Sequence, residues 1–511
     1  MKHHTLFGAI PLLFAGAAMA QTPEITAYYL SGSDAPANTP GYYASLDNLE
    51  TLSNQVASQK SNFNKLVLSF VQPSLVNYTQ NDLACTGLFG YICDTATVNK
   101  APKDNKSIAD FSQLRDIINT FKLHGVETYI AVGGWNFSCI PEYYDVTAGK
   151  VDACGPAGEQ YDSFPNPGPR NRFDNPISGQ AADQAYRNVV QLANDLGVAG
   201  IDLDYEEFWH ADLNAYSWRL TPDSVQPPAS NVEYLNTATL MSRGKGVRVY
   251  NDSMQLNPAE QPYPRIMPDT VDKFAAIMRS LYQAIDAINP ELVLSTAAPA
   301  TGGIPNMSAN WGSNAYTSNT YGGAWWGGNL YGLIYNTALQ YPDLVDRLST
   351  IGIMSYDLSE TDCGGDTNIP CDLAGQVDYY YGAFFSWLKS GDTIRPGHAV
   401  VKGSPSYASA AIQPQKLLIS PAITVGFEVG RPATGNLLLS KDLLTDIATR
   451  TARYSPSGMI MWDLYKDKRH DEPMGGWDPA WARPNDVLTA TCHIMGLSGE
   501  QYDCASTVPT P

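Results

Sequence analysis

Three acidic residues alternate with apolar ones in the segment Gly200-Ile201-Asp202-Leu203-Asp204-Tyr205-Glu206. On a β-strand this alternation places Asp202, Asp204 and Glu206 on one face and the apolar side chains on the other. Crowded carboxylates raise one another's proton affinity, so one of them can stay protonated near neutral pH and act as a general acid. We expect Glu206 to be that acid because it comes last on the strand, with Asp202 deepest and Asp204 between them.

Other interpretations of the acidic segment are open. A divalent cation such as Mg²⁺ could bind the three carboxylates inside a barrel. A calcium-binding loop is disfavoured, because the sixth position of that motif requires glycine and Glu207 stands there. A solvated acidic strand face would leave the apolar alternate positions unexplained.

The elements that must position these acids recur along the chain. Short runs rich in β-branched and apolar residues are followed by segments with helical periodicity, which is typical of parallel βα architecture. We therefore predict an α/β fold, a closed (β/α)8 TIM barrel with its active site at the C-terminal ends of the strands. The expected strands are 25–30, 65–71, 126–132, 199–205, 292–298, 351–356, 416–426 and 458–462.

Apolar stripes at helical spacing mark the connecting helices. One predicted core-facing stripe begins at Ile108 and ends at Phe121, in a helix opened by a capping box of Ser107 and Asp110 and closed by Gly125. A second stripe runs from Val271 to Ile288. Further helices are expected at 181–196, 330–347, 376–389, 440–453 and 484–495.

The chain of 511 residues is much longer than the roughly 250 residues that such a barrel needs. The excess lies mostly after expected strands, where it would form walls around the active face. We expect a catalytic barrel over 21–500 and a C-terminal tail over 501–511, and an independent module at 207–269 is a less favoured alternative. The insertions are 73–106, 136–180, 207–269, 299–328 and 358–375.

Residues 1–20 have the pattern of a cleavable secretory signal, with Lys2, an apolar stretch over 6–15 and the small-residue end Ala18-Met19-Ala20. The apolar stretch is too short to span a bilayer, so we expect a secreted, extracellular protein. Eight cysteines form four sequence-local couples, and local disulfides are the simplest assignment, although spacing does not prove connectivity. The couples are Cys85 with Cys93, Cys139 with Cys154, Cys363 with Cys371, and Cys492 with Cys504.

The formal net charge of −19 argues against nucleic acid or an anionic membrane as a partner. A zinc site is a weaker interpretation of the cysteines, because the histidines are scattered. Aromatic residues make up 11% of the chain and could stack on sugars or fill a core. We expect no cofactor and a monomeric protein.

Four motifs resemble those of glycoside hydrolase family 18, and they follow one another along the chain in that family's order. The D-x-x-D-x-D-x-E motif of that family's fourth barrel strand is matched by Ala199, Asp202, Asp204 and Glu206, so the first acid is missing. The segment Ala131-Val132-Gly133-Gly134-Trp135 resembles S-x-G-G, with Ala131 in place of the serine. Met354-Ser355-Tyr356-Asp357 resembles M-x-Y-D, and Trp462 is similar to the tryptophan beneath the reacting sugar.

The resemblance implies a chitinase that hydrolyses β-1,4-linked N-acetylglucosamine in chitin or chitooligosaccharides with retention. The 2-acetamido carbonyl of the substrate would attack its own anomeric carbon, while Glu206 protonates the leaving oxygen and later activates water. Asp204 would hold the acetamido N–H, tuned by Asp202, and Tyr356 would hydrogen-bond the attacking carbonyl oxygen. Contacts to the substrate are expected from Trp462, Asp357, Met354, Trp135, Gly134 and Tyr28.

Little more than the expected helix 440–453 separates the last two strands, so the insertion that deepens the cleft of many processive relatives is absent. We therefore expect an open groove and endo-type cleavage. Four interpretations compete with a chitinase. They are an enzyme acting on the chitobiose core of N-glycans, a lectin (which Glu206 disfavours), a metal-dependent barrel enzyme, and a secreted adhesin or toxin component.

Overall fold

The computed structural model describes the barrel and helices around it. The described residues are 22–32, 40–93, 105–134, 137, 143–145, 150–152, 163–168, 175–206, 219–222, 232–235, 247–250, 268–299, 333–334, 337–338, 341–355, 358, 370–385, 389, 393–394, 415–416, 418–430, 438–470 and 477–507.

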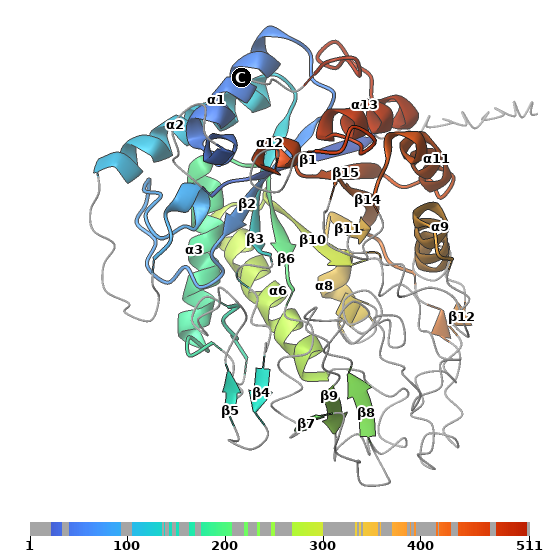
Figure 1. Cartoon of the computed structure of the whole chain (residues 1–511). Coiled ribbons are helices and arrows are strands. Elements are labelled where there is room, and N and C mark those ends of the chain that lie inside the picture. The colour runs from blue at the N-terminus through green and yellow to red at the C-terminus, as the bar shows by residue number, and fades with distance from the viewer. Residues whose placement is uncertain are drawn as a thin grey trace, which may run out of the picture.

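Eight parallel strands form a closed barrel in the order β1-β15-β14-β11-β10-β6-β3-β2 (Figure 1). This confirms the predicted (β/α)8 fold, and two of the expected strands, 65–71 and 458–462, have the predicted bounds. The strands are β1 (Glu24–Leu30), β2 (Lys65–Val71), β3 (Glu127–Gly133), β6 (Gly200–Asp204), β10 (Val293–Pro299), β11 (Thr350–Ser355), β14 (Ala422–Glu428) and β15 (Gly458–Trp462).

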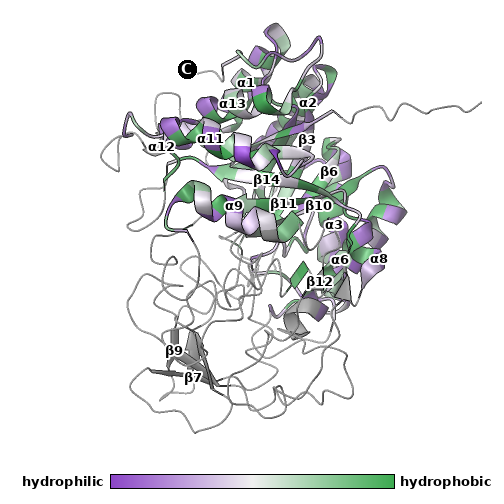
Figure 2. Cartoon of the chain, turned by 90° about the vertical axis from the view of Figure 1, so that its right-hand side faces the viewer, coloured by the Kyte–Doolittle hydropathy of each residue, from purple (hydrophilic) through white to green (hydrophobic). Residues whose placement is uncertain are grey.

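Helices surround the barrel, and their ribbons change between hydrophilic and hydrophobic residues within each turn (Figure 2). Side chains at Ser45, Asp372 and Ser440 cap the first turns of α1, α9 and α11. The predicted helix at 330–347 is described in part and includes α8. The helices are η1 (Pro40–Ala44), α1 (Leu46–Ser58), η2 (Leu88–Gly90), α2 (Asn105–Leu123), α3 (Gln180–Leu196), α6 (Pro268–Ile288), α8 (Pro342–Asp346), α9 (Leu373–Phe384), α11 (Lys441–Ala452), α12 (Lys466–His470) and α13 (Pro484–Met495).

Three details of the prediction are wrong. Helix α2 begins at Asn105, so Ser107 lies inside it and donates its hydroxyl to Asp82 instead of capping the helix. Ile108, which the predicted stripe placed in the core, is 43% exposed. The expected strand 416–426 is split, because Gln415–Lys416 belongs to a separate small sheet and β14 starts only after Pro421, which has no N–H to donate to a ladder.

Three small antiparallel sheets lie on the side of the barrel at which its strands end (Figure 1). Two of them fall in the predicted insertions 136–180 and 207–269, and the third lies between β11 and β14. They are formed by β4 (Tyr143–Asp145) with β5 (Lys150–Asp152), by β7 (Arg219–Pro222), β8 (Val232–Leu235) and β9 (Val247–Tyr250), and by β12 (Thr393–Ile394) with β13 (Gln415–Lys416).

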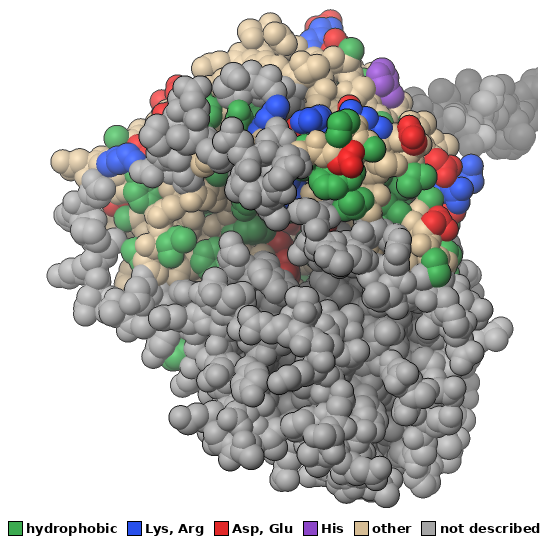
Figure 3. Space-filling view, viewed as in Figure 1, with side chains coloured by type: hydrophobic (Ala, Val, Ile, Leu, Met, Phe, Trp, Pro, Cys, Tyr) green, Lys and Arg blue, Asp and Glu red, His purple; other side chains and the backbone are tan. Residues whose placement is uncertain are grey.

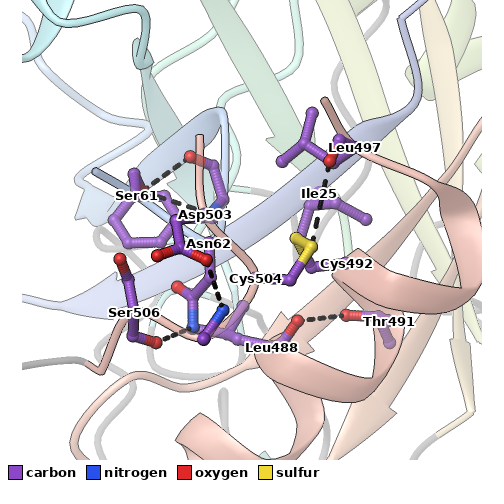
Figure 4. Close-up of a disulfide and its surroundings, with 12 residues drawn as sticks. Ile25, Ser61, Asn62, Leu488, Thr491, Cys492, Leu497, Asp503, Cys504 and Ser506 are labelled. Atoms are coloured by element: carbon purple, nitrogen blue, oxygen red, sulfur yellow. Dashed lines mark hydrogen bonds between the residues drawn. A yellow bond between two sulfur atoms is a disulfide. The ribbon is translucent and has the colours of Figure 1, made fainter. Parts of the chain in front are cut away.

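The C-terminal segment is attached to the opposite end of the barrel (Figure 4). A disulfide joins Cys492 of α13 to Cys504, the Asp503 N–H donates to the Ser61 carbonyl at 2.8 Å, and the Tyr502 hydroxyl donates to the Gly125 carbonyl at 2.6 Å. Ser61 and Gly125 precede β2 and β3, so this segment lies at the N-terminal ends of the strands.

The predicted couple Cys85 with Cys93 forms a second disulfide. Cys371 is also disulfide-bonded. Cys139, Cys154 and Cys363 lie outside the described residues. Two of the four predicted couples are therefore confirmed.

Surface charges of both signs are interspersed with apolar side chains over the described part of the face in Figure 3. None of the described helices is both long and apolar enough to cross a membrane.

Candidate active site

The acidic side chains of β6 point into the barrel, as the alternation predicts. Asp202 and Asp204 are each only 4% exposed, and Glu206 lies half-buried just beyond the C-terminal end of the strand. The alternate residues Ile201 and Leu203 are fully buried on the outer face, in the core formed with the helices. The strand thus carries its acids from the barrel interior to the mouth.

Asp202 is held by two hydroxyl groups from other strands. The Tyr28 hydroxyl on β1 donates to Asp202 Oδ2 at 2.6 Å, and Ser295 Oγ on β10 donates to Oδ1 at 2.5 Å. These two hydrogen bonds satisfy both oxygens of the buried carboxyl group. Tyr28, expected to contact substrate, therefore has a defined contact with the deepest acid of the ladder.

Ser295 is a site residue that the sequence analysis missed. Asp202 lies in register with Ala131 of β3 on one side and with Ser295 of β10 on the other. The position at which the S-x-G-G motif has its serine therefore offers no hydroxyl here, and the neighbouring strand on the other side supplies one. A serine within the apolar run of an expected strand was the only signal for it.

Asp204 forms a coupled pair with Glu206. Burial raises the pKa of the Asp204 carboxyl well above its usual range, and the charges of Glu206 and Asp202 and a hydrogen bond with Glu206 raise it further. The pair therefore retains a proton at a pH where an ordinary aspartate has lost it. Asp204 Oδ1 is buried and has no hydrogen-bond partner among the described residues.

The glycines after β3 bring that strand close to the end of β6. Gly134 has a φ of +70° and its N–H donates to the Asp204 carbonyl at 2.8 Å. A Cβ at Gly134 would lie 2.5 Å from Phe70 Cζ, so only glycine fits between the ring and the strand. Gly134, expected to contact substrate, here contacts Phe70 and the backbone of the acid ladder.

An aromatic group of Trp462, Tyr28 and Phe70 lies in the barrel, with Trp462 at the end of the strand opposite β6. The ring of Trp462, half-buried at the end of β15, is 5.4 Å from that of Tyr28 and 5.6 Å from that of Phe70 between centroids. The register of β2 with β3 shifts between Ser69 and Val71, next to Phe70. Phe70 did not stand out in the sequence, because it looked like any other apolar residue of an expected strand. Met354 lies half-buried near the end of β11, in register with Gly426.

Three expected site residues, Trp135, Tyr356 and Asp357, lie outside the described residues. Within the described part of the chain, no three histidine, cysteine, aspartate or glutamate side chains are arranged so that they could hold a metal ion.

Comparison with known proteins gives similarity at the level of the fold. No family model and no curated protein matches the sequence. A family GH18 chitinase from Chromobacterium violaceum is 13% identical, with 93% of this chain and 83% of that chain covered and a TM-score of 0.42. YKL-39, solved in the presence of chitooligosaccharides, is 10% identical (93% and 99% covered, TM-score 0.40).

The catalytic domain of a hyperthermophilic chitinase from Pyrococcus furiosus is also 10% identical, with 94% of this chain and 98% of that chain covered and a TM-score of 0.39. These similarities concern the barrel fold, which the strand order already establishes. A shared fold does not identify the reaction, which depends on the residues of the site.

Proposed function

We propose that the chain is a chitinase that hydrolyses β-1,4-linked N-acetylglucosamine with retention, with Glu206 as the general acid and base. The observation that carries the proposal is the acid ladder itself, in which a proton-retaining pair, Asp204 and Glu206, ends at the barrel mouth, with Trp462 at the end of the strand on the opposite side of the barrel. Such a pair keeps a transferable proton close to where an arriving glycosidic oxygen would lie.

In the first step, the 2-acetamido carbonyl oxygen of the substrate attacks the anomeric carbon. The bond to the departing sugar breaks, and its oxygen keeps the electron pair and takes the proton of Glu206. The cyclised intermediate carries positive charge, which the ionised Asp204 stabilises by accepting the acetamido N–H. Asp204 Oδ1, which is buried and has no partner among the described residues, is the acceptor suited to this contact.

In the second step, water adds to the anomeric carbon from the side that the first sugar left. A proton of the water passes to Glu206. The bond between the anomeric carbon and the acetamido oxygen breaks, and its electron pair returns to the acetamido group. Two inversions at the same carbon give net retention. The requirement for an N-acetyl group follows, so cellulose should not be cleaved.

The aromatic group supports the sugar in this scheme. Trp462 forms the apolar floor, held by edge contact with Tyr28 and by Phe70. Trp135, Tyr356 and Asp357 take the roles that the family resemblance implies, and endo-type cleavage in an open groove remains part of the proposal. The disulfides of Cys85 with Cys93 and of Cys492 with Cys504 are compatible with an extracellular protein.

The decisive experiment is cleavage of the N-acetylglucosamine tetramer by the wild type and by Glu206→Gln. The variant should bind the tetramer but lose turnover, because it keeps the shape of the side chain and loses the proton. Glu291→Gln, an exposed glutamate in the turn after α6, is the matched control and should remain active. Retained turnover in Glu206→Gln would contradict the acid assignment.

A high-mannose glycopeptide assayed in parallel separates the related activities. Cleavage of the glycopeptide alone would favour an enzyme of the N-glycan core. Binding of the tetramer without cleavage by the wild type would favour a lectin.

A second carboxylate near the mouth makes one further test necessary. Glu428 ends β14 in register with Trp462, so it faces the interior, and it forms a buried ion pair with Lys466. A carboxylate opposite the acid could serve as an enzyme nucleophile. A thiazoline analogue of the cyclised intermediate should therefore inhibit strongly if the acetamido group is the nucleophile, and no inhibition would point to a carboxylate such as Glu428.

A further inference from the structure

A buried lysine lies beneath the acid ladder. Lys65 begins β2 with its side chain on the inner face of the barrel, and the residue is only 4% exposed. Lysine is almost never buried to this extent unless it is paired. Here Lys65 Nζ lies 3.2 Å from Glu24 Oε1 of β1 and 3.9 Å from the centroid of the Tyr129 ring of β3.

The Tyr129 ring occupies the layer directly below Asp202. Tyr129 is in register with Gly200, two residues before Asp202 on β6. A Cβ at Gly200 would lie 2.4 Å from Tyr129 Cε1, so the glycine that opens the strand makes room for the ring. The ammonium group, the ring and the deepest acid therefore occupy adjoining positions in the closed end of the barrel.

The charges at this end act on one another. Burial alone would lower the pKa of Lys65, but Glu24, Tyr129 and Asp202 together raise it, so the side chain remains an ammonium group. Burial, partly offset by Lys65, raises the pKa of the Tyr129 phenol to about 12, so the ring stays neutral. Lys65 thus remains positively charged, and the charge of Asp202 is one of the causes.

The position at which the family motif has its first acid is occupied by Ala199, which packs partly buried against the interior cluster. Charge at this depth is supplied by other strands, with Glu24 on β1 and Lys65 on β2. The chain therefore differs from the family motif in one residue of β6, and it has charged residues on β1 and β2 at this depth of the barrel.

We propose that Lys65 is a positioning residue for the acid ladder, a buried cation that keeps Asp202 ionised and leaves the single proton on the Asp204–Glu206 pair. Its effect on turnover rests on the proposed function, whereas its effect on Asp202 does not. The described charged and titratable groups that face this region are Glu24 and Tyr28 on β1, Lys65 on β2, Glu127 and Tyr129 on β3, and Asp202, Asp204 and Glu206 on β6 and just beyond its end.

Removal of the cation and removal of its counterion should have opposite effects. Without Lys65, ionised Asp202 loses its attracting charge in a medium of low dielectric constant, so it takes up a proton at a higher pH. Without the Glu24 charge, the positive charge of Lys65 is no longer partly neutralised by its ion-pair partner. Lys65 then attracts Asp202 more strongly, so Asp202 stays ionised to a lower pH.

The test is the pH dependence of kcat for the N-acetylglucosamine tetramer in Lys65→Met and Glu24→Gln. The acid limb of the pH profile should move to higher pH by about one unit in Lys65→Met. In Glu24→Gln it should move to lower pH by a smaller amount, and KM should change little in both variants. Lys65→Arg keeps the charge and should restore the wild-type limb. Shifts in the same direction, or losses uniform over pH, would indicate a merely structural role and overturn the proposal.

A second measurement separates this inference from the proposed function. The carboxyl carbons of the full chain, labelled with ¹³C at aspartate, are titrated by NMR, and Asp202→Asn identifies the signal of Asp202. Opposite displacements of that titration in the two variants support the role of Lys65 even if the wild type cleaves no tetramer. An Asp202 titration unchanged in Glu24→Gln and in whichever Lys65 variants fold would overturn it.

Discussion

Both faces of β6 are buried, but their side chains have different roles. On the outer face, Ile201 and Leu203 are 0% exposed and belong to the core between the strands and helices. On the inner face, Asp202 and Asp204 are 4% exposed, among hydroxyl groups and another carboxyl. Burial alone therefore does not decide whether a residue stabilises the fold, because its neighbours decide whether burial is favourable.

The difference is one of free energy. Complete burial of a leucine contributes about 1.5–3 kcal/mol to the free energy of unfolding. A buried carboxyl is unfavourable unless hydrogen bonds or protonation compensate. Asp202 has two such hydrogen bonds, and Asp204 is compensated by its raised proton affinity. We therefore expect inner-face substitutions to affect chemistry and outer-face substitutions to affect stability.

Asp204→Asn should show the largest effect on the inner face. The amide cannot share a proton with Glu206 or carry the charge that stabilises the cyclised intermediate, so kcat should fall by about 10²- to 10⁴-fold. Tetramer cleavage by the purified variant measures this. A loss of less than tenfold would contradict the role assigned to Asp204.

The same variant should be more stable than the wild type in a way that depends on pH. Folding raises the pKa of the Asp204 carboxyl. The contribution of this carboxyl to stability is therefore fully present only below its pKa in the unfolded chain, about 4, and is lost as pH rises through the raised value. Asparagine does not titrate. The melting temperature of Asp204→Asn relative to the wild type should therefore increase with pH above about 4, and a constant difference would contradict this linkage.

Leu203→Ala tests the outer face. The truncation should lower the free energy of unfolding by about 2–5 kcal/mol through lost burial and a cavity, while kcat stays near wild type at temperatures where the variant is folded. Denaturant titration measures the change. Leu123→Ala, at the 74% exposed end of α2, is the control and should differ by no more than about 0.5 kcal/mol. A folded Leu203→Ala protein that has lost its activity would weaken the division between the two faces.

The period of two along β6 explains why these faces could be predicted from sequence. Side chains alternate on any strand, so the inward position of Asp202 and Asp204 followed as soon as a barrel was inferred. The residues that surround the acids could not be predicted in this way. Ser295 and Lys65 lie on other strands, and their proximity to Asp202 depends on strand order and register, which local patterns do not encode.

Helix ends show the same limit. The buried hydroxyl of Ser107 bonds to Asp82, a partner 25 residues away, and this contact was invisible to a rule about local capping. By contrast, the local couples Cys85 with Cys93 and Cys492 with Cys504 were predicted correctly, because short loops bring their ends together whatever the fold. Contacts between residues close together in the sequence were predicted correctly, and contacts that depend on the tertiary structure were missed.

Ser295→Ala should change turnover at neutral pH much less than Asp204→Asn does. It removes one of the two hydrogen bonds to Asp202, worth about 1.5–3 kcal/mol for a charged acceptor, so the acid limb of the pH profile should move to higher pH, with kcat at neutral pH little changed. Thr296→Val is the control, because Thr296 donates its hydroxyl to the Leu203 carbonyl and not to an acid. It should lower stability by about 1 kcal/mol and leave the acid limb in place.

A compensating substitution sharpens this test. Ala131 lies in register with Asp202 on the other side of β6, where the family motif has serine. Ala131→Ser in the Ser295→Ala background should return the acid limb toward its wild-type position, because a hydroxyl from β3 would replace the one from β10. Failure of the rescue, with the double variant folded, would mean that Ser295 acts through the packing of β10 and not through its hydrogen bond to Asp202.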